Sequence, residues 1–158
     1  MAKDDHEVDH QAAMKRTGFW GRRGAGCLFY ARSTGRFLIA MRSDMVAEPY
    51  TWGTWGGAVD GGSSPEETVR REVWEEAGYD EPFELVHVHT YRHSSGFVYE
   101  NFIAVVEHEF EPALDEETAD YMWVKEGRWP SYLHFGMVDL IENVPNLVER
   151  VKAASPRP

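Results

Sequence analysis

A glycine-rich loop that runs directly into a helix with two marked ends is the most restrictive pattern in this chain. Ser64 is suited to the N-cap position and Pro65 to the first helical position, and Glu67 completes a capping box with Ser64. Gly78 favours the left-handed conformation in which many helices end. The sequence therefore predicts a helix over residues 65–77, held at its start by a tight loop.

This helix has an apolar face and, beside it, an acidic one. The apolar stripe consists of Val69, Val73 and Ala77, and the acidic stripe of Glu72, Glu75 and Glu76. Like charges at these spacings destabilise a helix by roughly 0.2–0.5 kcal/mol per pair, and a divalent cation would reverse that effect. Mg²⁺ prefers oxygen ligands and bridges carboxylates to phosphate oxygens. The alternative for this stripe is a solvated acidic face.

Strand patterns lie on both sides of the loop and helix. They cover residues 26–31, 36–41, 55–59, 83–93, 96–108 and 121–124. Ser33-Thr34-Gly35 predicts a hairpin turn between the first two strands. Residues 136–152 repeat apolar side chains every three or four positions, which predicts an amphipathic helix interrupted by Pro145. We expect an α/β fold in which helices cover both faces of one mixed sheet.

The 158 residues suit one domain. We expect a loose polar arm at residues 1–17, a single domain over 18–152 and a frayed tail at 153–158. No apolar run approaches the roughly 20 residues that span a bilayer, and the N-terminus lacks a secretory signal. Cys27 is the only cysteine, which predicts a cytoplasmic protein and a buried apolar role for Cys27 rather than a nucleophile.

The formal net charge of −11 limits the possible partners. Such a charge repels a polyphosphate backbone, and the basic residues form no stripe, so stable binding of long nucleic acid is not expected. A small phosphorylated substrate is compatible with the charge, because carboxylates clustered in a pocket can hold Mg²⁺.

Residues 57–79 resemble the Nudix box, G-x5-E-x7-R-E-U-x-E-E-x-G-U, in which U is bulky and apolar. Gly57 takes its first position, and its end is matched by Arg71-Glu72-Val73-Trp74-Glu75-Glu76-Ala77-Gly78-Tyr79. One fixed position differs, because Ser63 stands where the box has its first glutamate. The preceding segment, Trp52-Gly53-Thr54-Trp55-Gly56-Gly57, is similar to the usual W-x-x-P-G-G entry, with Trp55 in place of proline. The resemblance implies a Nudix hydrolase with an α/β/α sandwich around a mixed sheet.

The resemblance also implies roles for the residues of the box. Glu72, Glu75 and Glu76 would bind Mg²⁺, for which Mn²⁺ is a substitute, and the carbonyl of Gly56 would be a further ligand. Gly57, Arg71 and Gly78 would be structural. In the family the arginine pairs with the glutamate that Ser63 replaces here. Asp60 and Glu67 are near enough in sequence to take its place.

The reaction implied is attack by water on a phosphorus atom of a diphosphate linkage, in a nucleoside diphosphate linked to another moiety. The expected catalytic residues are Glu75, Glu76 and Glu117. Glu117 precedes an aromatic strand, where many family members have a further glutamate. Glu116 is its nearest competitor, and two exposed loop acids are the alternative.

Weaker patterns concern the substrate. The expected contacts are Arg42 with phosphate and Trp52, Trp55 and Tyr99 by stacking, and their alternatives are a solvated charge and core packing. His87, His89 and His93 share strand parity, which suits either zinc or water-facing side chains.

Ser63 and Trp55 also motivate a second function class, a Nudix-like nucleotide-binding or regulatory module with weak catalysis. The nucleotide remains open at this point, and so does a homodimer.

Overall fold

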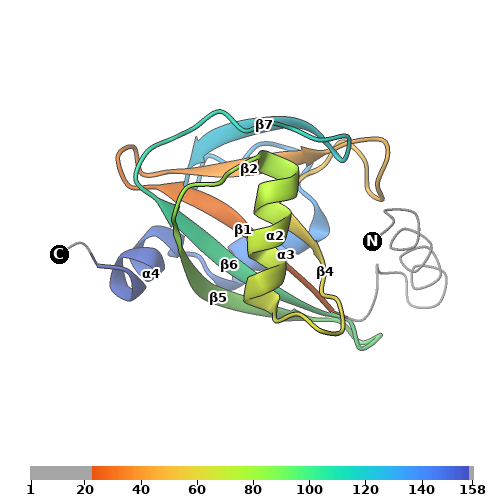
Figure 1. Cartoon of the computed structure of the whole chain (residues 1–158). Coiled ribbons are helices and arrows are strands. Elements are labelled where there is room, and N and C mark those ends of the chain that lie inside the picture. The colour runs from red at the N-terminus through yellow and green to blue at the C-terminus, as the bar shows by residue number, and fades with distance from the viewer. Residues whose placement is uncertain (1–22, 157–158) are drawn as a thin grey trace.

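The computed structural model describes residues 23–156 (Figure 1). The arm expected at residues 1–17, the expected domain start at residue 18 and the last two residues of the expected tail lie outside these described residues. Within residues 23–156, no helix combines the length and the apolar character needed to cross a membrane.

The central strand of the sheet is β1 (Arg23–Ala31), which has two kinds of neighbour. It forms the predicted hairpin with β2 (Arg36–Arg42), and in the turn the Gly35 amide donates to the Ala31 carbonyl at 2.8 Å. Along its other edge β1 pairs in parallel with β6 (Val98–Val106), which pairs antiparallel with β5 (Glu84–Arg92). The sheet is therefore mixed, as predicted.

Two short strands fill a split between β1 and β2. β4 (Trp55–Ala58) pairs antiparallel with the first half of β1, whereas β3 (Trp52–Gly53) pairs antiparallel with the end of β2. β7 (Thr118–Lys125) pairs with β2 as well. Only Thr54 separates β3 from β4, so residues 52–58 bridge the two diverging strands. The glycine-rich loop that follows β4 thus begins at an opening in the sheet.

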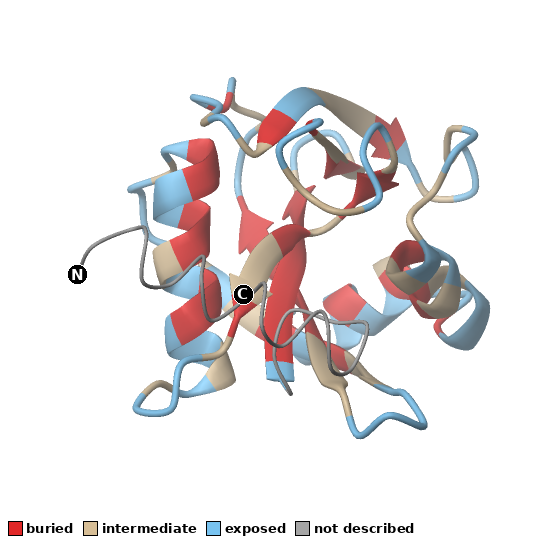
Figure 2. Ribbon diagram, turned by 90° about the vertical axis from the view of Figure 1, so that its right-hand side faces the viewer, coloured by how far each residue is buried: buried red, intermediate tan, exposed pale blue. Residues whose placement is uncertain are grey.

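Helices cover both faces of the sheet, which confirms the predicted α/β/α sandwich. α2 (Pro65–Ala77) lies over one face, and α3 (Phe135–Asn143) and α4 (Leu147–Ala154) lie against the other, with their buried sides turned toward the strands (Figure 2). The cluster under α2 includes Phe29, Leu38, Trp55, Val69, Val73 and Phe102. The cluster under α3 and α4 includes Leu28, Phe37, Ile103, Met137, Leu140 and Val151.

Both ends of α2 agree with the prediction. The Ser64 hydroxyl accepts from the Glu67 amide at 3.1 Å, and the Glu67 carboxylate accepts from the Ser64 amide at 2.9 Å, so the capping box is complete. Gly78 ends the helix with φ 66°, and its amide donates to the Trp74 carbonyl at 3.0 Å. A Cβ at Gly78 would lie 2.9 Å from the Cβ of Ala113.

We expect Gly78→Ala to lower the free energy of unfolding by about 1–2 kcal/mol from its left-handed backbone, and further through the contact with Ala113. Gly127→Ala is the matched control, since Gly127 has φ 85° and open space around an added Cβ. Chemical denaturation of both variants measures the difference. A loss for Gly78→Ala no larger than that for Gly127→Ala would contradict the contact.

The C-terminal helical segment is two helices rather than one interrupted helix. Val144-Pro145-Asn146 separates α3 from α4, because Pro145 has no amide hydrogen to continue the helical pattern. The start of α4 is instead satisfied from a distant loop, where the Glu126 carboxylate accepts from the amides of Leu147 (2.5 Å) and Val148 (3.2 Å).

The ordered chain also extends beyond the boundary expected at residue 152. α4 continues to Ala154, and Ser155 is buried. The carbonyl and the hydroxyl of Ser155 accept from Arg32 Nη2, at 3.0 and 2.5 Å. This contact, which joins residues 123 positions apart, holds residues that the sequence predicts to be frayed.

Candidate active site

A cavity of about 700 Å³ opens where the sheet splits. It is bounded by the glycines of residues 53–57, the C-terminal half of α2, the segment 115–118 and the start of α3. Its acidic lining residues are Glu48, Asp60, Glu72, Glu75, Glu76, Asp115, Glu116 and Glu117. The lining includes two arginines, Arg42 and Arg71, and no lysine. Phosphate groups would therefore need a cation in this cavity.

α2 presents its three glutamates to the cavity at different depths. Glu72 and Glu76, one turn apart, are each only 7% exposed, whereas Glu75 is exposed. Gly57 leaves room for one of them, because a Cβ there would lie 2.8 Å from Oε1 of Glu72. The amide of Gly56 donates to Oε1 of Glu76 at 3.1 Å. The backbone of β4 therefore positions the two buried carboxylates.

Burial makes these two carboxyl groups weaker acids than an exposed glutamate. It raises the pKa of Glu72 to about 7 and the pKa of Glu76 well above its usual value, and the charge of Glu117 raises both further. The two groups are hydrogen-bonded to each other, with the protonated Glu76 donating to Glu72. Two buried carboxylates can share a proton in this way, and a divalent cation would neutralise them without it.

The donor chemistry of this cluster fits Mg²⁺. Its candidate ligands are carboxylate and backbone oxygens, which Mg²⁺ prefers over nitrogen and sulfur. Glu75 and Glu117 line the same cavity as the buried pair. Across residues 23–156, no three acidic, histidine or cysteine side chains already surround a common point in the manner of a metal cluster.

The raised pKa of Glu72 leads to a stability prediction for the metal-free protein. The pKa of Glu72 rises from its usual value of 4.5 to about 7 in the folded protein, so the folded state holds the proton more tightly than the unfolded state. The contribution of this group to the free energy of unfolding is therefore fully present below pH 4.5 and is lost as the pH rises through about 7. We therefore expect Glu72→Gln to lose less thermal stability than wild type between pH 4.5 and 8 in EDTA. Equal losses measured by thermal unfolding would contradict the buried state of Glu72.

Arg71 pairs with Asp60, since the glutamate that pairs with this arginine in the family is replaced by Ser63. Its Nη1 lies 3.3 Å from Oδ2 of Asp60, and its Nη2 lies 3.7 Å from Oε1 of Glu72. Glu67, the other candidate, is hydrogen-bonded to the backbone of Ser64. Asp60 is thus the acid that the fold brings to Arg71, and this pair links the glycine-rich loop to α2.

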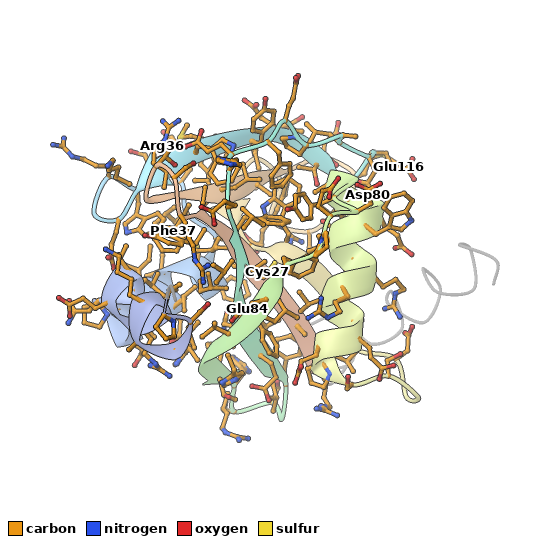
Figure 3. The ribbon with its side chains drawn as sticks, turned by 60° about the vertical axis from the view of Figure 1, so that its left-hand side comes forward. Cys27, Arg36, Phe37, Asp80, Glu84 and Glu116 are labelled. Carbon is orange, nitrogen blue, oxygen red and sulfur yellow. The ribbon has the colours of Figure 1, made fainter. Side chains whose placement is uncertain are left out.

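Glu117 and Glu116 both line the cavity, but their surroundings differ. Glu117 is half-buried and its charge acts on Glu72, Glu76 and Arg42, whereas Glu116 is exposed. In Figure 3, Glu116 lies at the edge of the molecule near the end of α2. Ser43 fixes this segment, because its amide donates to the Glu117 carbonyl and its hydroxyl to the Glu116 carbonyl. The geometry favours Glu117.

Two of the expected substrate contacts also reach the cavity. Arg42 donates through Nε to the Ala47 carbonyl at 2.6 Å, and burial lowers its pKa. The Tyr99 hydroxyl is hydrogen-bonded to the Thr54 hydroxyl at 2.8 Å, and burial raises its pKa. Both side chains are therefore held in place beside the carboxylates by neighbouring groups.

The expectation that Trp52 and Trp55 contact substrate is corrected by their burial. Trp55 is 0% exposed, its Nε1 donates to the Leu38 carbonyl at 3.2 Å, and it packs edge-on against Phe29. Trp52 is 6% exposed within the cluster under α3 and α4. Neither ring lines the cavity, so core packing is the role of both.

The three alternating histidines have separate partners. His87 contacts Glu100, His89 contacts Asp139 on α3, and His93 contacts Ser95. A β-bulge between His87 and His89 breaks the alternation that would have put them on one face. The zinc interpretation therefore has no support from this geometry.

Cys27 has the buried position expected from the sequence. It is 0% exposed in the middle of the sheet (Figure 3), and burial raises its pKa. A raised pKa keeps the thiol protonated, which disfavours a nucleophilic role.

Two further cavity residues, Asn101 and His134, are absent from the expectations above. Asn101 stands at the start of the apolar run 102–106, where a lone polar residue in a strand could have indicated a site. His134 is the N-cap of α3, and its Nδ1 accepts from the Gly136 amide at 3.0 Å. The sequence carries no helix-start pattern there that would have indicated this role.

Comparison with known proteins places this chain in a family. The family model of the NUDIX domain matches residues 20–142. A nucleoside triphosphate pyrophosphatase/Nudix hydrolase fusion protein of Bifidobacterium longum is 34% identical over 115 residues, which are 66% of this chain and 24% of that protein. The chain thus spans about a quarter of the length of that relative.

Solved structures share the fold. A Nudix hydrolase from M. smegmatis, RenU, aligns with a TM-score of 0.69 and 25% identity over 89% of this chain and 91% of that one. The NUDIX domain of Shewanella oneidensis NrtR, solved with ADP ribose, aligns with a TM-score of 0.64 and 19% identity over 94% and 99% of the two chains.

The family match covers the loop, the helix α2 and the sheet around the carboxylate-lined cavity. The chain belongs to the Nudix hydrolase family. The resemblance found in residues 57–79 is thereby confirmed at the level of the family.

Proposed function

We propose that this protein is a Mg²⁺-dependent enzyme that hydrolyses a diphosphate linkage in a nucleoside diphosphate joined to another moiety. The observation that carries this proposal is the buried pair Glu72 and Glu76, whose pKa values are raised and which face a cavity together with Glu75 and Glu117. Burying two acids one turn apart is unfavourable without a compensating cation. The burial of both carboxyl groups beside the cavity supports a metal-binding role.

The chain's residues divide the work of this reaction. Glu72, Glu75 and Glu76, with the Gly56 carbonyl, would hold the metal, and Glu117 would accept the proton of the attacking water. Mg²⁺, when bound, supplies positive charge that polarises phosphoryl oxygens. Water oxygen forms a bond to phosphorus, the bridging P–O bond breaks, and the two products each retain a phosphate. Arg42 lies within the same cavity and would contact a phosphate oxygen.

The cavity also bears on substrate size. Its volume of about 700 Å³ lies within the usual range for sites of small ligands. One protein of the same fold binds ADP ribose, and a homologous fusion protein carries the name of a nucleoside triphosphate pyrophosphatase. We infer a small nucleotide-derived substrate, and a cytoplasmic location suits such a substrate.

The test is release of products from a panel of nucleoside diphosphate derivatives with Mg²⁺, with Mn²⁺ and with EDTA. We expect turnover with either metal and none in EDTA. Reaction in H₂¹⁸O would place the label in a phosphate product, as attack on phosphorus requires. Label in a released sugar or alcohol would contradict that attack.

A second candidate is a nucleotide-binding module with weak catalysis, which the replacement of the box glutamate by Ser63 favours. It predicts Mg²⁺-linked nucleotide binding, measured by calorimetry, without efficient turnover of any compound in the panel. Turnover of even one compound for many catalytic cycles per protein molecule, abolished by EDTA, would exclude this candidate.

A further inference from the structure

One wall of the cavity carries no carboxylate. We call it the neutral wall, and it is formed by Tyr91, Tyr99, Asn101, His134, Phe135 and Met137. The only one of these that titrates near neutrality, His134, has its pKa lowered to about 4 by burial and by the charge of Arg42. This wall is therefore uncharged at neutral pH, in contrast to the acidic wall along α2.

Asn101 has the least satisfied side chain of the neutral wall. It is 2% exposed and lines the cavity, and its Nδ2 makes no hydrogen bond. Its paired residue on β1 is Gly26, which has no side chain to offer a partner. Its paired residue on β5 is His89, whose Nε2 is already hydrogen-bonded to Asp139 at 2.6 Å. A buried N–H donor without a partner is costly, so a ligand acceptor is the natural partner here.

His134 provides a second donor in this wall. Its Nδ1 accepts from the Gly136 amide, so the proton of the neutral ring is on Nε2. The base of the His134 side chain lies beside Gly53, where an added Cβ would lie 3.4 Å from Cβ of His134. Thr54, the next residue, contacts Tyr99, two residues before Asn101. Asn101 and His134 both line the cavity that Gly53, Thr54 and Tyr99 also line.

Aromatic rings complete the neutral wall. The ring centroids of His134 and Phe135 lie 4.2 Å apart, with an angle of 31° between the ring planes. The ring centroids of Tyr91 and Phe135 lie 6.4 Å apart. Phe135 is 44% exposed although it is a large apolar side chain. Aromatic faces beside neutral hydrogen-bond donors suit a planar heterocycle that carries acceptor atoms.

We propose that the neutral wall binds the base of a nucleotide, and that Asn101 is a specificity-determining residue that donates through Nδ2 to a carbonyl oxygen or ring nitrogen of that base. This inference rests on the proposed function, because it names the part of the substrate that the same cavity selects. It requires a base-bearing substrate, so diphosphates linked only to sugars or other base-free groups would be excluded.

The test uses calorimetry with products that cannot be hydrolysed at an anhydride. Nucleoside 5′-monophosphates and ribose 5-phosphate are titrated, with Mg²⁺, into wild type, Asn101→Asp and Asn101→Ala. Asparagine and aspartate have the same size, but aspartate offers no N–H. Asn146→Asp is the matched control, since Asn146 is exposed and makes no side-chain capping bond.

We expect wild type and Asn146→Asp to bind at least one nucleotide about tenfold or more tightly than ribose 5-phosphate. Both Asn101 variants should lose about tenfold in affinity for that nucleotide. Asn101→Ala, which adds no charge, should bind ribose 5-phosphate as wild type does. Thermal unfolding confirms that each variant is folded, and Asn101→Ala serves if the aspartate variant is not.

Two results would overturn the inference: equal affinities of wild type for nucleotides and ribose 5-phosphate, or unchanged nucleotide affinity in both Asn101 variants. Because binding needs no turnover, these results are separable from a failure of the proposed hydrolysis. A protein that selects bases through Asn101 but hydrolyses nothing would contradict the proposed function alone.

Discussion

Glu76→Gln is expected to lower the turnover number of Mg²⁺-dependent hydrolysis by at least about a hundredfold. Glutamine has the same size but cannot supply a negative oxygen to the metal. Lewis-acid stabilisation by a metal contributes several kcal/mol to such reactions, and each ~1.4 kcal/mol corresponds to tenfold in rate. Steady-state kinetics on the best compound of the panel, with a Mg²⁺ titration of each protein, measures the effect.

Stability separates this expectation from simple unfolding. Because burial raises the pKa of Glu76, an amide at this position should leave the metal-free protein at least as stable as wild type at pH 8. The matched control is Glu66→Gln, on the exposed first turn of the same helix and away from the cavity, which should retain full turnover. A folded Glu76→Gln protein with wild-type turnover would exclude Glu76 as a metal ligand.

Asp60→Asn is expected to reduce turnover by about ten- to a hundredfold. Asp60 is the partner of Arg71, and this pair connects the glycine-rich loop to the helix that carries Glu72. Without the charge of Asp60, the ion pair that fixes the position of the loop relative to Glu72 would be lost. A misplacement of about 1 Å in an active site can cost a hundredfold in rate. Adding Ser63→Glu to Asp60→Asn should restore at least part of the turnover, since it returns an acid to the position used in the box.

The rescue is what distinguishes a specific pairing from general damage to the loop. Asp80→Asn, an equivalent change at an exposed position just after α2, is the control and should be silent. If Asp60→Asn has wild-type kinetics, the pair contributes nothing to catalysis. If the single variant is impaired and Ser63→Glu gives no recovery, Asp60 acts through some contact other than Arg71.

Local patterns predict much of this fold, because they depend on neighbouring residues. The ends of α2 follow from Ser64, Glu67 and Gly78, and the hairpin of β1 and β2 follows from its turn. β3 has only two residues, which is too short for a period. The parallel pairing of β1 with β6 joins segments more than 60 residues apart, and no local pattern specifies it. Arg32 and Ser155 show the same limit at the C-terminus.

Some residues of the candidate site can likewise be predicted from local sequence, and others cannot. The acidic stripe of α2 is visible in the spacing of its glutamates, and Asp60 was one of two candidates for Arg71. Burial separates residues whose chemistry alone is alike: Trp55 is aromatic and adjacent to the box, yet it packs in the core. Asn101 is distant from the box in sequence, and only the pairing of β6 with β1 brings it to the cavity.

The split in the sheet has a consequence for which parts of the cavity can be changed independently. Because residues 52–58 bridge β1 and β2, one cavity is bounded by α2 and by the start of α3, which belong to separate layers. Under the proposed function, substitutions near the start of α3 would change the surface that meets the ligand, while the glutamates of α2 stay unchanged. Ligand choice and metal binding would then be separable by mutation within one cavity.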